Sequence, residues 1–558
     1  MQPNQERETL TPDLALLNWA QSKPDQCYLR QRASRQFVDY TFAQVAREVQ
    51  CFVSVLHSLG LEPGDRVALV SKNCAEWFIV DLAIMMGGFV SVPIFPTANE
   101  ETINYCIEHS EAKVIVAGKL DDNSATQAVI HQHPDIVSIA LPYNSAPICQ
   151  KHFRDLIESA QPYQGVPTHH DDDLMSIVYT SGTSGTPKGA LLTYGAFIWS
   201  VEKLIGLIEA TGEDRLFSYL PLAHITERVY IFGTSIMTGA CTAFPESLDT
   251  FVDDLKAHQP TLFISVPRLW TLFKQRIEEK LPPTKLSLLL AIPLVNRLIK
   301  QKIAKGLGLA STRLLGCGSA PVSPSLLLWF DRLDLPICEA WGMTETFAYS
   351  TLNLPYRRDK VGSVGQAGPG VEISIADDDE ILVRSHGVFS GYYLQQEASN
   401  ESFTDEWLHT GDIGYLDDEG YLFIQGRKKD TFKTAKGKFV APVPIEKKLA
   451  DVVRADMLCL IGLGLPAPIL LVVVPEMSSF DPERYQKSLT EHLHKFNQTL
   501  DSHEKIKGAL IVDTPWSIDN GILTPTLKIK RHVLEQRYHQ LGQDWPTDKL
   551  VLWEKDLT

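Results

Sequence analysis

The stretch LMSIVYTSGTSGTPKG, residues 174–189, joins an apolar run to a loop rich in glycine and hydroxyl side chains. Residues 174–180 are apolar and β-branched, which predicts a buried strand. Glycine lets the backbone of the following loop approach a ligand closely, and successive N–H groups there can form an anion-binding nest. The candidate phosphate-binding residues are Thr180, Ser181, Gly182, Thr183, Ser184, Gly185, Thr186 and Lys188.

The spacing of this loop differs from that of a P-loop. In a GxxxxGK[ST] motif counted from Gly182, Pro187 stands where glycine is needed, and Lys188 is followed by Gly189. The spacing therefore argues against a kinase-like or GTPase-like NTPase. The alternative to an anion-binding loop is a plain Gly/Ser linker.

Helix and strand patterns alternate before and after this loop. Thr41 with Gln44 predicts a capping box that opens a helix running to Leu56. Residues 59–71 predict a turn that leads into a strand, and residues 112–118 predict a further strand. Residues 78–95 predict a buried helix followed by a core strand, since this stretch is short for a membrane span. The alternation predicts an α/β layered fold.

The pattern changes between Val364 and Gly426. Short alternating runs separated by acidic or glycine turns predict β-hairpins in a small barrel or sheet. A charged stretch begins after Arg427, and the remaining ~130 residues carry strands and helices of their own. We therefore expect an α/β protein of two domains. Residues 1–426 would form layered α/β subdomains with a small β-barrel, and residues 427–558 a small α+β domain.

Composition limits the functions that this chain can have. Its 558 residues are 44% hydrophobic and 22% charged, typical of a globular protein rather than a disordered chain, a fibre or a membrane bundle. The 52 basic and 68 acidic residues give a net charge of −16, so we expect no nucleic-acid partner.

The cysteines and the first residues bear on the compartment. Nine scattered cysteines without a CxxC pair indicate reduced thiols, and the first thirteen residues are too polar and acidic for a signal peptide. We therefore expect a cytoplasmic protein.

The polar run HHDDD, residues 169–173, precedes the strand at 174. Two imidazoles and three carboxylates could bind a metal ion, but a charge run of this kind is more often a solvated linker. We expect the linker.

Six further segments follow the glycine-rich loop in order. They are LPLAHITERV (220–229), GCGSAP (316–321), EAWGMTET (339–346), WLHTGD (407–412), GRKKD (426–430) and LTPTLKIKR (523–531). Together with YTSGTSGTPKG they resemble the motifs of the adenylate-forming (AMP-binding) superfamily. The resemblance spans about residues 41–534 and is strongest to the long-chain fatty acyl-CoA synthetases.

The resemblance implies a reaction in two steps. The carboxylate of a medium- or long-chain fatty acid attacks the α-phosphate of ATP in the presence of Mg²⁺, which gives acyl-AMP and pyrophosphate. Coenzyme A then displaces AMP. Two alternatives stay open: an acyl-AMP ligase that delivers to a carrier protein or another acceptor, and a non-catalytic nucleotide-binding relative.

The resemblance also implies roles for individual residues. Asp412 would contact the ribose, and Arg427 the ribose or a phosphate. Glu345 would contact the metal ion, and Thr344 the α-phosphate. His224 and Lys528 would complete the catalytic set, the latter by stabilising charge in the transition state. Trp341 would stack on adenine, and the other wall of the adenine pocket would be formed by Gly318, Ser319 and Ala320. The other residues expected to bind ATP or AMP are Glu339, Ala340 and Gly342.

Three positions depart from the usual family pattern. Trp341 stands where most relatives have tyrosine, and its larger ring should still stack on adenine. Cys317 replaces a residue that is often glycine, and Leu527 precedes the lysine where glycine is usual.

A mobile C-terminal domain is implied as well. Lys429 matches the hinge about which this domain rotates between the half-reactions, and Lys436 and Gly437 match a loop on the coenzyme A side. A few backbone rotations at one residue suffice for such a swing.

Residues 285–306 combine apolar side chains with Arg297, Lys300, Lys302 and Lys305. This pattern predicts either a helix lying on a membrane surface or a pair of core-covering helices broken at Pro293. The first alternative would place the protein in peripheral contact with the inner membrane surface.

Overall fold

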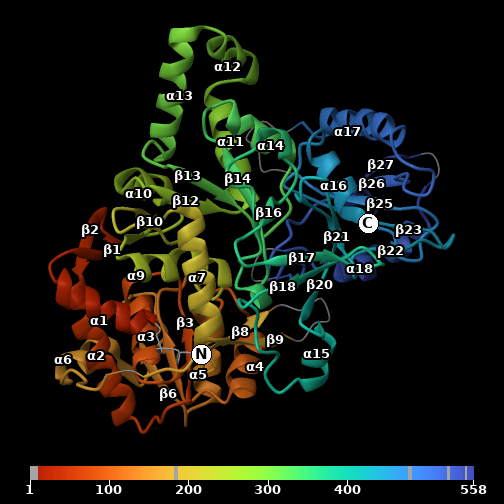
Figure 1. Ribbon diagram of the computed structural model, residues 1–558. Helices are drawn as coiled ribbons and strands as arrows, with labels where there is room; N and C mark the ends of the chain where they lie inside the picture. Colours follow the sequence, from red (N-terminus) through yellow and green to blue (C-terminus); the bar gives the residue numbers. More distant parts are fainter. Residues whose placement is uncertain are drawn as a thin grey trace, which may run out of the picture.

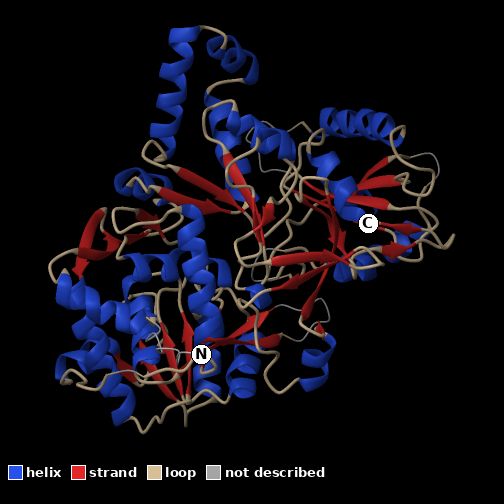
Figure 2. Cartoon of the chain, viewed as in Figure 1, coloured by secondary structure: helices blue, strands red, loops and turns tan. Residues whose placement is uncertain are grey.

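The computed structural model describes residues 10–166, 168–180, 187–474, 481–518, 520–524, 528–546 and 549–557. A large N-terminal domain and a separate C-terminal domain lie side by side (Figure 1). Strands form the interior of both, and helices cover their faces (Figure 2). The protein is therefore of the mixed α/β class, as the sequence predicts.

A seven-stranded sheet of order β7-β6-β5-β3-β4-β8-β9 forms the first layer. All its neighbours are parallel except β8 and β9, which form an antiparallel pair around the glycine-rich loop. The strands are β3 (Arg66–Val70), β4 (Val90–Ile94), β5 (Val114–Ala117), β6 (Val137–Ala140), β7 (Lys151–His152), β8 (Leu174–Thr180) and β9 (Lys188–Thr193). The strands predicted within 59–71, 112–118 and 174–180 are confirmed.

Helices cover the faces of this sheet and bury apolar side chains in the core. Thr41 forms the predicted capping box with Gln44 at the start of α2. Residues 78–95 form the predicted buried helix and core strand, which are the end of α3 and β4. The helices are α1 (Pro12–Ser22), α2 (Phe42–Ser58), α3 (Ala75–Met86), α4 (Glu100–Ser110), α5 (Ser124–Gln132), α6 (Phe153–Ser159) and α7 (Tyr194–Ile208).

Two further sheets complete the α/β part of the domain. One has the order β10-β11-β1-β2 and the other β12-β13-β14-β15-β16. Their strands are β1 (Cys27–Ala33), β2 (Gln36–Thr41), β10 (Arg215–Phe217), β11 (Cys241–Phe244), β12 (Leu262–Ser265), β13 (Leu314–Cys317), β14 (Ile337–Trp341), β15 (Thr351–Leu352) and β16 (Gln366–Ala367).

Most of the helices between these strands are short. They are α8 (Ile225–Glu227), the π-helix η1 (Arg228–Gly233), α9 (Thr234–Thr238), α10 (Phe251–His258), α11 (Pro267–Lys280), α14 (Pro324–Asp331) and the 3₁₀ turns η2 (Thr344–Thr346) and η3 (Arg358–Lys360).

The predicted hairpins after Val364 form a five-stranded antiparallel sheet. β17 (Glu372–Ile375) pairs with β18 (Glu380–Arg384), and β20 (Trp407–Leu416) pairs with β21 (Leu422–Arg427). β19 (Phe403–Thr404), which follows α15 (Gln396–Glu401), pairs with β20 and closes one edge.

The C-terminal domain has its own four-stranded sheet between two apolar clusters. The strands are β24 (Met457–Ile461), β25 (Ile469–Val473), β26 (Gly508–Val512) and β27 (Val551–Trp553). α16 (Pro442–Ala450), α17 (Pro482–Asn497), α18 (Arg531–Gln543) and the 3₁₀ turn η4 (Glu554–Leu557) surround it, and the hairpin β22 (Phe432–Lys433) and β23 (Phe439–Val440) precedes it.

Residues 285–306 lie in a helical hairpin, α12 (Pro283–Leu290) and α13 (Pro293–Leu307), which projects from the N-terminal domain (Figure 1). The break expected at Pro293 is present. Among the described residues, no helix is both long enough and apolar enough to cross a bilayer.

The prediction of a solvated linker at 169–173 is wrong for one residue. The side chain of His169 is buried, its Nε2 lies 2.9 Å from Asp13 Oδ2, and its ring stacks on Tyr194. Nowhere in the described ranges do three His, Cys, Asp or Glu side chains gather in a way that could hold a metal ion. All nine cysteines are free thiols, as expected.

Candidate functional site

The predicted adenine-pocket segments meet at the ends of two parallel strands, β13 and β14. A Cβ added to Gly318 would lie 3.1 Å from the carbonyl oxygen of Ala340, so a larger residue would press the segments apart. A cavity of about 30 Å³ lies here, and its walls include Gly318, Ser319, Ala340, Trp341 and Gly342. Its remaining lining is mainly apolar, contributed by α7, η1, β12, β13, β14 and β15.

Two predicted pocket residues lie elsewhere. Ala320 is exposed, just beyond the cavity wall. Glu339 is buried in β14, and burial raises the pKa of its carboxyl to about 7, with Lys447 acting in the opposite direction. Neither is among the described residues that line the cavity.

Trp341, Asp412 and Arg427 are joined by a hydrogen bond and an ion pair. The indole Nε1 of Trp341 donates to Asp412 Oδ2 over 2.8 Å, and Arg427 Nε lies 3.0 Å from Asp412 Oδ1. Asp412 and Arg427 are direct partners in the β20–β21 ladder, which fixes their spacing. The carboxylate charge of Asp412 raises the pKa of Arg427. Each carboxylate oxygen has a second lone pair with which it can accept a further hydrogen bond.

Glu345 begins a second polar cluster. Tyr392 donates its phenolic O–H to Glu345 Oε1 over 2.6 Å, and Lys188 Nζ lies 4.9 Å from the centroid of the Tyr392 ring. Burial, and then the Glu345 charge, raises the pKa of Tyr392 and keeps it a donor. Thr344, half-buried, is the first residue of the same turn η2.

Our sequence analysis missed Tyr392. Its signal was the GYY run at 391–393, whose first two residues bridge to β9 directly after the glycine-rich loop. Thr180 and Lys188 are paired at the base of that loop. The predicted residues Ser181, Gly182, Thr183, Ser184, Gly185 and Thr186 lie outside the described ranges.

His224 caps the short helix α8. Its Nδ1 accepts the Thr226 N–H over 3.2 Å, so a neutral ring carries its proton on Nε2. Burial, and then the charge of Lys528, lowers the pKa of His224 to about 3. His224 is therefore a neutral hydrogen-bond donor at physiological pH. Thr226 Oγ1 lies 3.4 Å from Ser319 Oγ, which joins this helix to the cavity wall.

The segment that carries His224 is held by side chains of the first sheet layer. Asn73 Nδ2 donates to the carbonyl of Leu220 over 2.7 Å and to Glu227 Oε1 over 3.2 Å. Arg228 forms a fully buried ion pair with Asp81, 3.0 Å apart. Sequence patterns gave no signal for Asn73, because its partners are more than 140 residues away.

Lys528 reaches the site from the C-terminal domain. Its backbone N–H donates to Thr524 Oγ1, and its side chain stays in contact with solvent. Desolvation by the surrounding protein, and then the charge of Arg427, lowers the pKa of Lys528 to about 8, while Asp412 and Glu345 act in the opposite direction. Lys528 therefore lies within the electrostatic field of both polar clusters.

The predicted hinge residue lies between the small β-sheet and the sheet of the C-terminal domain. Lys429 is exposed in the turn between β21 and β22. Its neighbour Lys428 bonds to Asp378 and Glu380 of the small β-sheet, over 2.5 and 3.1 Å. Lys436 and Gly437 are exposed at the tip of the β22–β23 hairpin, far from β14 in Figure 1, so the structure does not bring them to the other site residues.

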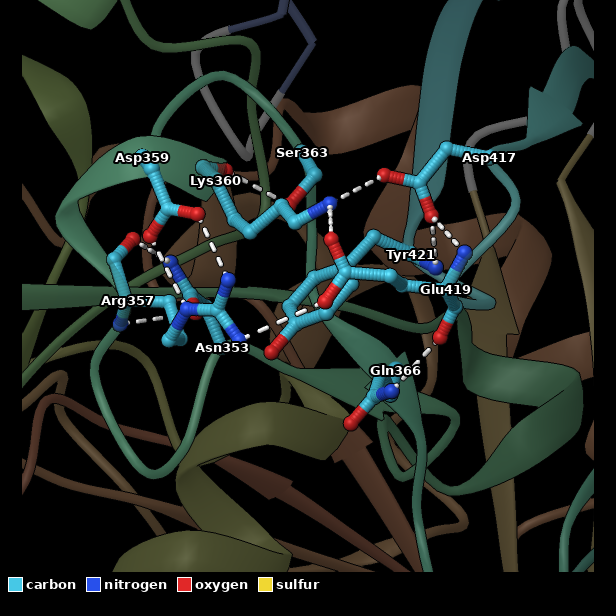
Figure 3. A network of polar contacts seen from close by, with 9 residues as sticks. All are labelled: Asn353, Arg357, Asp359, Lys360, Ser363, Gln366, Asp417, Glu419 and Tyr421. Atoms are coloured by element: carbon cyan, nitrogen blue, oxygen red, sulfur yellow. Dashed lines mark hydrogen bonds and ion pairs between the residues drawn. The ribbon is translucent and has the colours of Figure 1, made fainter.

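A polar network supports the hairpin that carries Asp412 (Figure 3). Lys360 Nζ lies 2.8 Å from Asp417 Oδ2 and 2.5 Å from Glu419 Oε1, at the turn between β20 and β21. Arg357 joins the same turn through Glu419 and bonds to Asp359. These contacts fix the β20–β21 turn to the segment that follows β15.

The family described as AMP-binding enzyme matches residues 16–393, and its C-terminal domain matches residues 429–541. The chain is an AMP-binding enzyme.

Curated relatives of this AMP-binding enzyme cover nearly its full length. It is 28% identical to long-chain-fatty-acid–CoA ligase FadD15 of Mycobacterium bovis, over 92% of this chain and 93% of the relative. It is 29% identical to long-chain-fatty-acid–CoA ligase 5 of Rattus norvegicus, over 88% and 82%. The fold of this AMP-binding enzyme matches that of the Bacillus subtilis O-succinylbenzoate coenzyme A synthetase in complex with ATP and magnesium, with a TM-score of 0.74 and 22% identity over 93% and 99% of the two chains.

Proposed function

We propose that this enzyme activates a medium- or long-chain fatty acid with ATP and transfers the acyl group to coenzyme A. One observation carries the proposal: Lys528 of the C-terminal domain interacts electrostatically with Asp412 and Arg427, which are paired across the proposed domain boundary. A carboxylate paired with an arginine suits ribose hydroxyls, and a cation beside it suits phosphate oxygens. The fatty-acid ligases among its relatives support this choice of substrate.

In the first step, a carboxylate oxygen of the acid attacks the α-phosphorus and the bond to the β-phosphate breaks, which releases pyrophosphate. Lys528 stabilises the negative charge that develops on the transferring group. Neutral His224 donates a hydrogen bond beside it, and Thr344 contacts the α-phosphate. In the second step the thiol of coenzyme A attacks the acyl carbonyl carbon, and AMP leaves.

The residues present fit a magnesium ion bound together with the phosphates of ATP. Glu345 offers a carboxylate, the ligand type that Mg²⁺ prefers, and Tyr392 orients it. Mg²⁺ typically takes only one or two protein carboxylates when phosphates supply other ligands. When bound, the ion would neutralise phosphate charge.

We further propose the domain division at residues 426/427, with Lys429 as the hinge. Rotation about it would withdraw Lys528 and bring Lys436 and Gly437 toward the site for the second step. This accounts for the exposure of that hairpin tip in the present arrangement. We expect the enzyme to work in the cytoplasm.

An ATP–pyrophosphate exchange screen across fatty, aryl and short acids tests the proposal. We expect exchange to be fastest with fatty acids, and AMP release to depend on coenzyme A. Exchange without stimulation by coenzyme A would favour a carrier-protein acceptor, and absence of exchange with every acid would overturn the proposal. Formation of ADP in place of AMP would overturn it as well.

A further inference from the structure

The hairpin α12–α13 stands apart from the rest of the N-terminal domain (Figure 1). Its two helices pack on each other, and α13 also packs against α10. Leu286 and Leu307 are buried, and Leu290, Ile299 and Ile303 pack onto the adjoining core. These contacts anchor the hairpin to the N-terminal domain.

The hairpin carries the densest group along the sequence of exposed large apolar side chains in the described ranges. Leu288, Ile292, Leu294 and Leu298 are 65%, 45%, 83% and 66% exposed, all within residues 288–298. The other exposed large apolar side chains of the described ranges occur singly along the chain or, at Tyr415 and Leu416, as one adjacent pair. Single exposed apolar residues need no explanation, but a group of four indicates an interaction surface.

Charge distinguishes this hairpin from the rest of the chain. Residues 283–307 contain Lys285, Arg297, Lys300, Lys302 and Lys305 and no acidic residue, whereas the whole chain has a net charge of −16. Lys300 bonds to Asp334 over 2.8 Å, and the other four basic residues are exposed. The apolar tip is therefore flanked by positive charge.

We propose that the α12–α13 hairpin docks on the surface of a bilayer that contains anionic lipids. Apolar side chains at the tip would enter the boundary between headgroups and acyl chains, and the basic side chains would lie at the level of the phosphates. A second copy of the chain fits less well, because two identical hairpins would bring like charges together. The docking goes beyond the proposed reaction and does not depend on it.

Flotation of the full-length protein with vesicles tests this surface. The vesicles are pure phosphatidylcholine, or phosphatidylcholine and phosphatidylglycerol at about 7:3, at salt concentrations of about 0.05 and 0.5 M. We expect binding to the anionic vesicles, at least ~10-fold stronger than to the neutral ones and weakened by salt. No preference for the anionic vesicles would overturn the proposal.

Matched variants locate the binding. Leu294→Asp with Leu298→Asp, and separately Lys302→Glu with Lys305→Glu, should each lower binding by ~10-fold. The controls are Ile148→Asp, at a position 81% exposed, and Lys487→Glu with Lys505→Glu, both on the exposed surface of the C-terminal domain.

Unchanged melting temperature and pyrophosphate exchange show that each variant is folded. Equal loss in hairpin and control variants would overturn the assignment. So would a concentration-dependent dimer, seen by light scattering, that Leu294→Asp abolishes, because the occupant would then be a second copy.

Discussion

The two domains contribute to the candidate site in different ways. Asp412 of the N-terminal domain is held by Trp341 and by Arg427, its partner in the β20–β21 ladder, and Glu345 is held by Tyr392. The C-terminal domain contributes Lys528, which is exposed and reaches the site through the position of the whole domain. The first arrangement is preorganised, and the proposed rotation about Lys429 would withdraw the second.

This difference predicts different consequences for the two half-reactions. In the proposed reaction the AMP group stays bound through both steps, so a defect at Trp341 or Asp412 should impair both. The position of Lys528 depends on the position of the C-terminal domain, so this side chain should matter only in the domain arrangement that brings it to the site. Measuring the half-reactions separately therefore tests the comparison directly.

The largest effect is expected from Lys528→Ala. Removal of one charge-stabilising group typically costs about 10²–10³ in rate, so adenylation should fall by this factor. Thioester formation from supplied acyl-AMP should stay within about 3-fold of wild type, since it does not use this side chain. Stopped-time assays of pyrophosphate release and of acyl-CoA formation measure the two steps. Lys530→Ala is the control, and equal losses in both steps would show that the assignment of Lys528 is wrong.

A smaller effect on both steps is expected from Trp341→Phe. The ring face is kept, but Asp412 loses the 2.8 Å hydrogen bond from the indole. A hydrogen bond to a charged group contributes about 2 kcal/mol, so KM for ATP and for acyl-AMP should each rise by ~30-fold. Trp553→Phe, whose indole donates to Gln486 in the C-terminal domain, is the matched control. A rise in KM for only one of the two substrates would contradict the expectation that Trp341 and Asp412 bind the AMP group in both steps.

The elements of the fold were predictable where the pattern is local. The capping box at Thr41 and Gln44, the helix and strand within 78–95, and the hairpins after Val364 depend on neighbouring residues and are confirmed. The burial of His169 was not predictable, because its partners Asp13 and Tyr194 are distant in sequence.

The candidate site shows the same difference between local sequence patterns and contacts of residues that are distant in the sequence. Motif residues such as Asp412 could be named from the sequence, but their partners could not. Tyr392 lies 47 residues from Glu345, and Asn73 lies 147 residues from Leu220. The donation from Trp341 to Asp412 was also missed, since the sequence suggested only a stacking role for this ring. Such contacts depend on how the sheets pack, which no local pattern contains.

Tyr392→Phe tests whether the hydrogen bond from Tyr392 orients Glu345 for the metal ion. Residues that orient a metal ligand typically change metal affinity by 10-fold or more when they are mutated, so half-saturation of adenylation by Mg²⁺ should rise by ~10-fold. The ATP concentration is kept saturating in this titration. Tyr393→Phe, one residue further, is the control and should leave the Mg²⁺ dependence unchanged. An identical shift in both variants would mean that Tyr392 acts only through packing.

The smallest effect is expected from pH, and it concerns Lys528 of the C-terminal domain. The pKa of Lys528 is lowered to about 8, so the side chain is cationic below this pH and neutral above it. Because the cation is the form that stabilises the transition state, kcat/KM for adenylation should halve near pH 8 and continue to fall as pH rises. The kcat/KM profile reports groups of the free enzyme, in which no phosphate is present to raise this pKa. In Lys528→Ala the alkaline fall should be absent, whereas in Trp341→Phe it should persist. If kcat/KM for Lys528→Ala falls with the same pH dependence, the titrating group is not Lys528. The proposed electrostatic interaction of Lys528 with Asp412 and Arg427 would then lose its support.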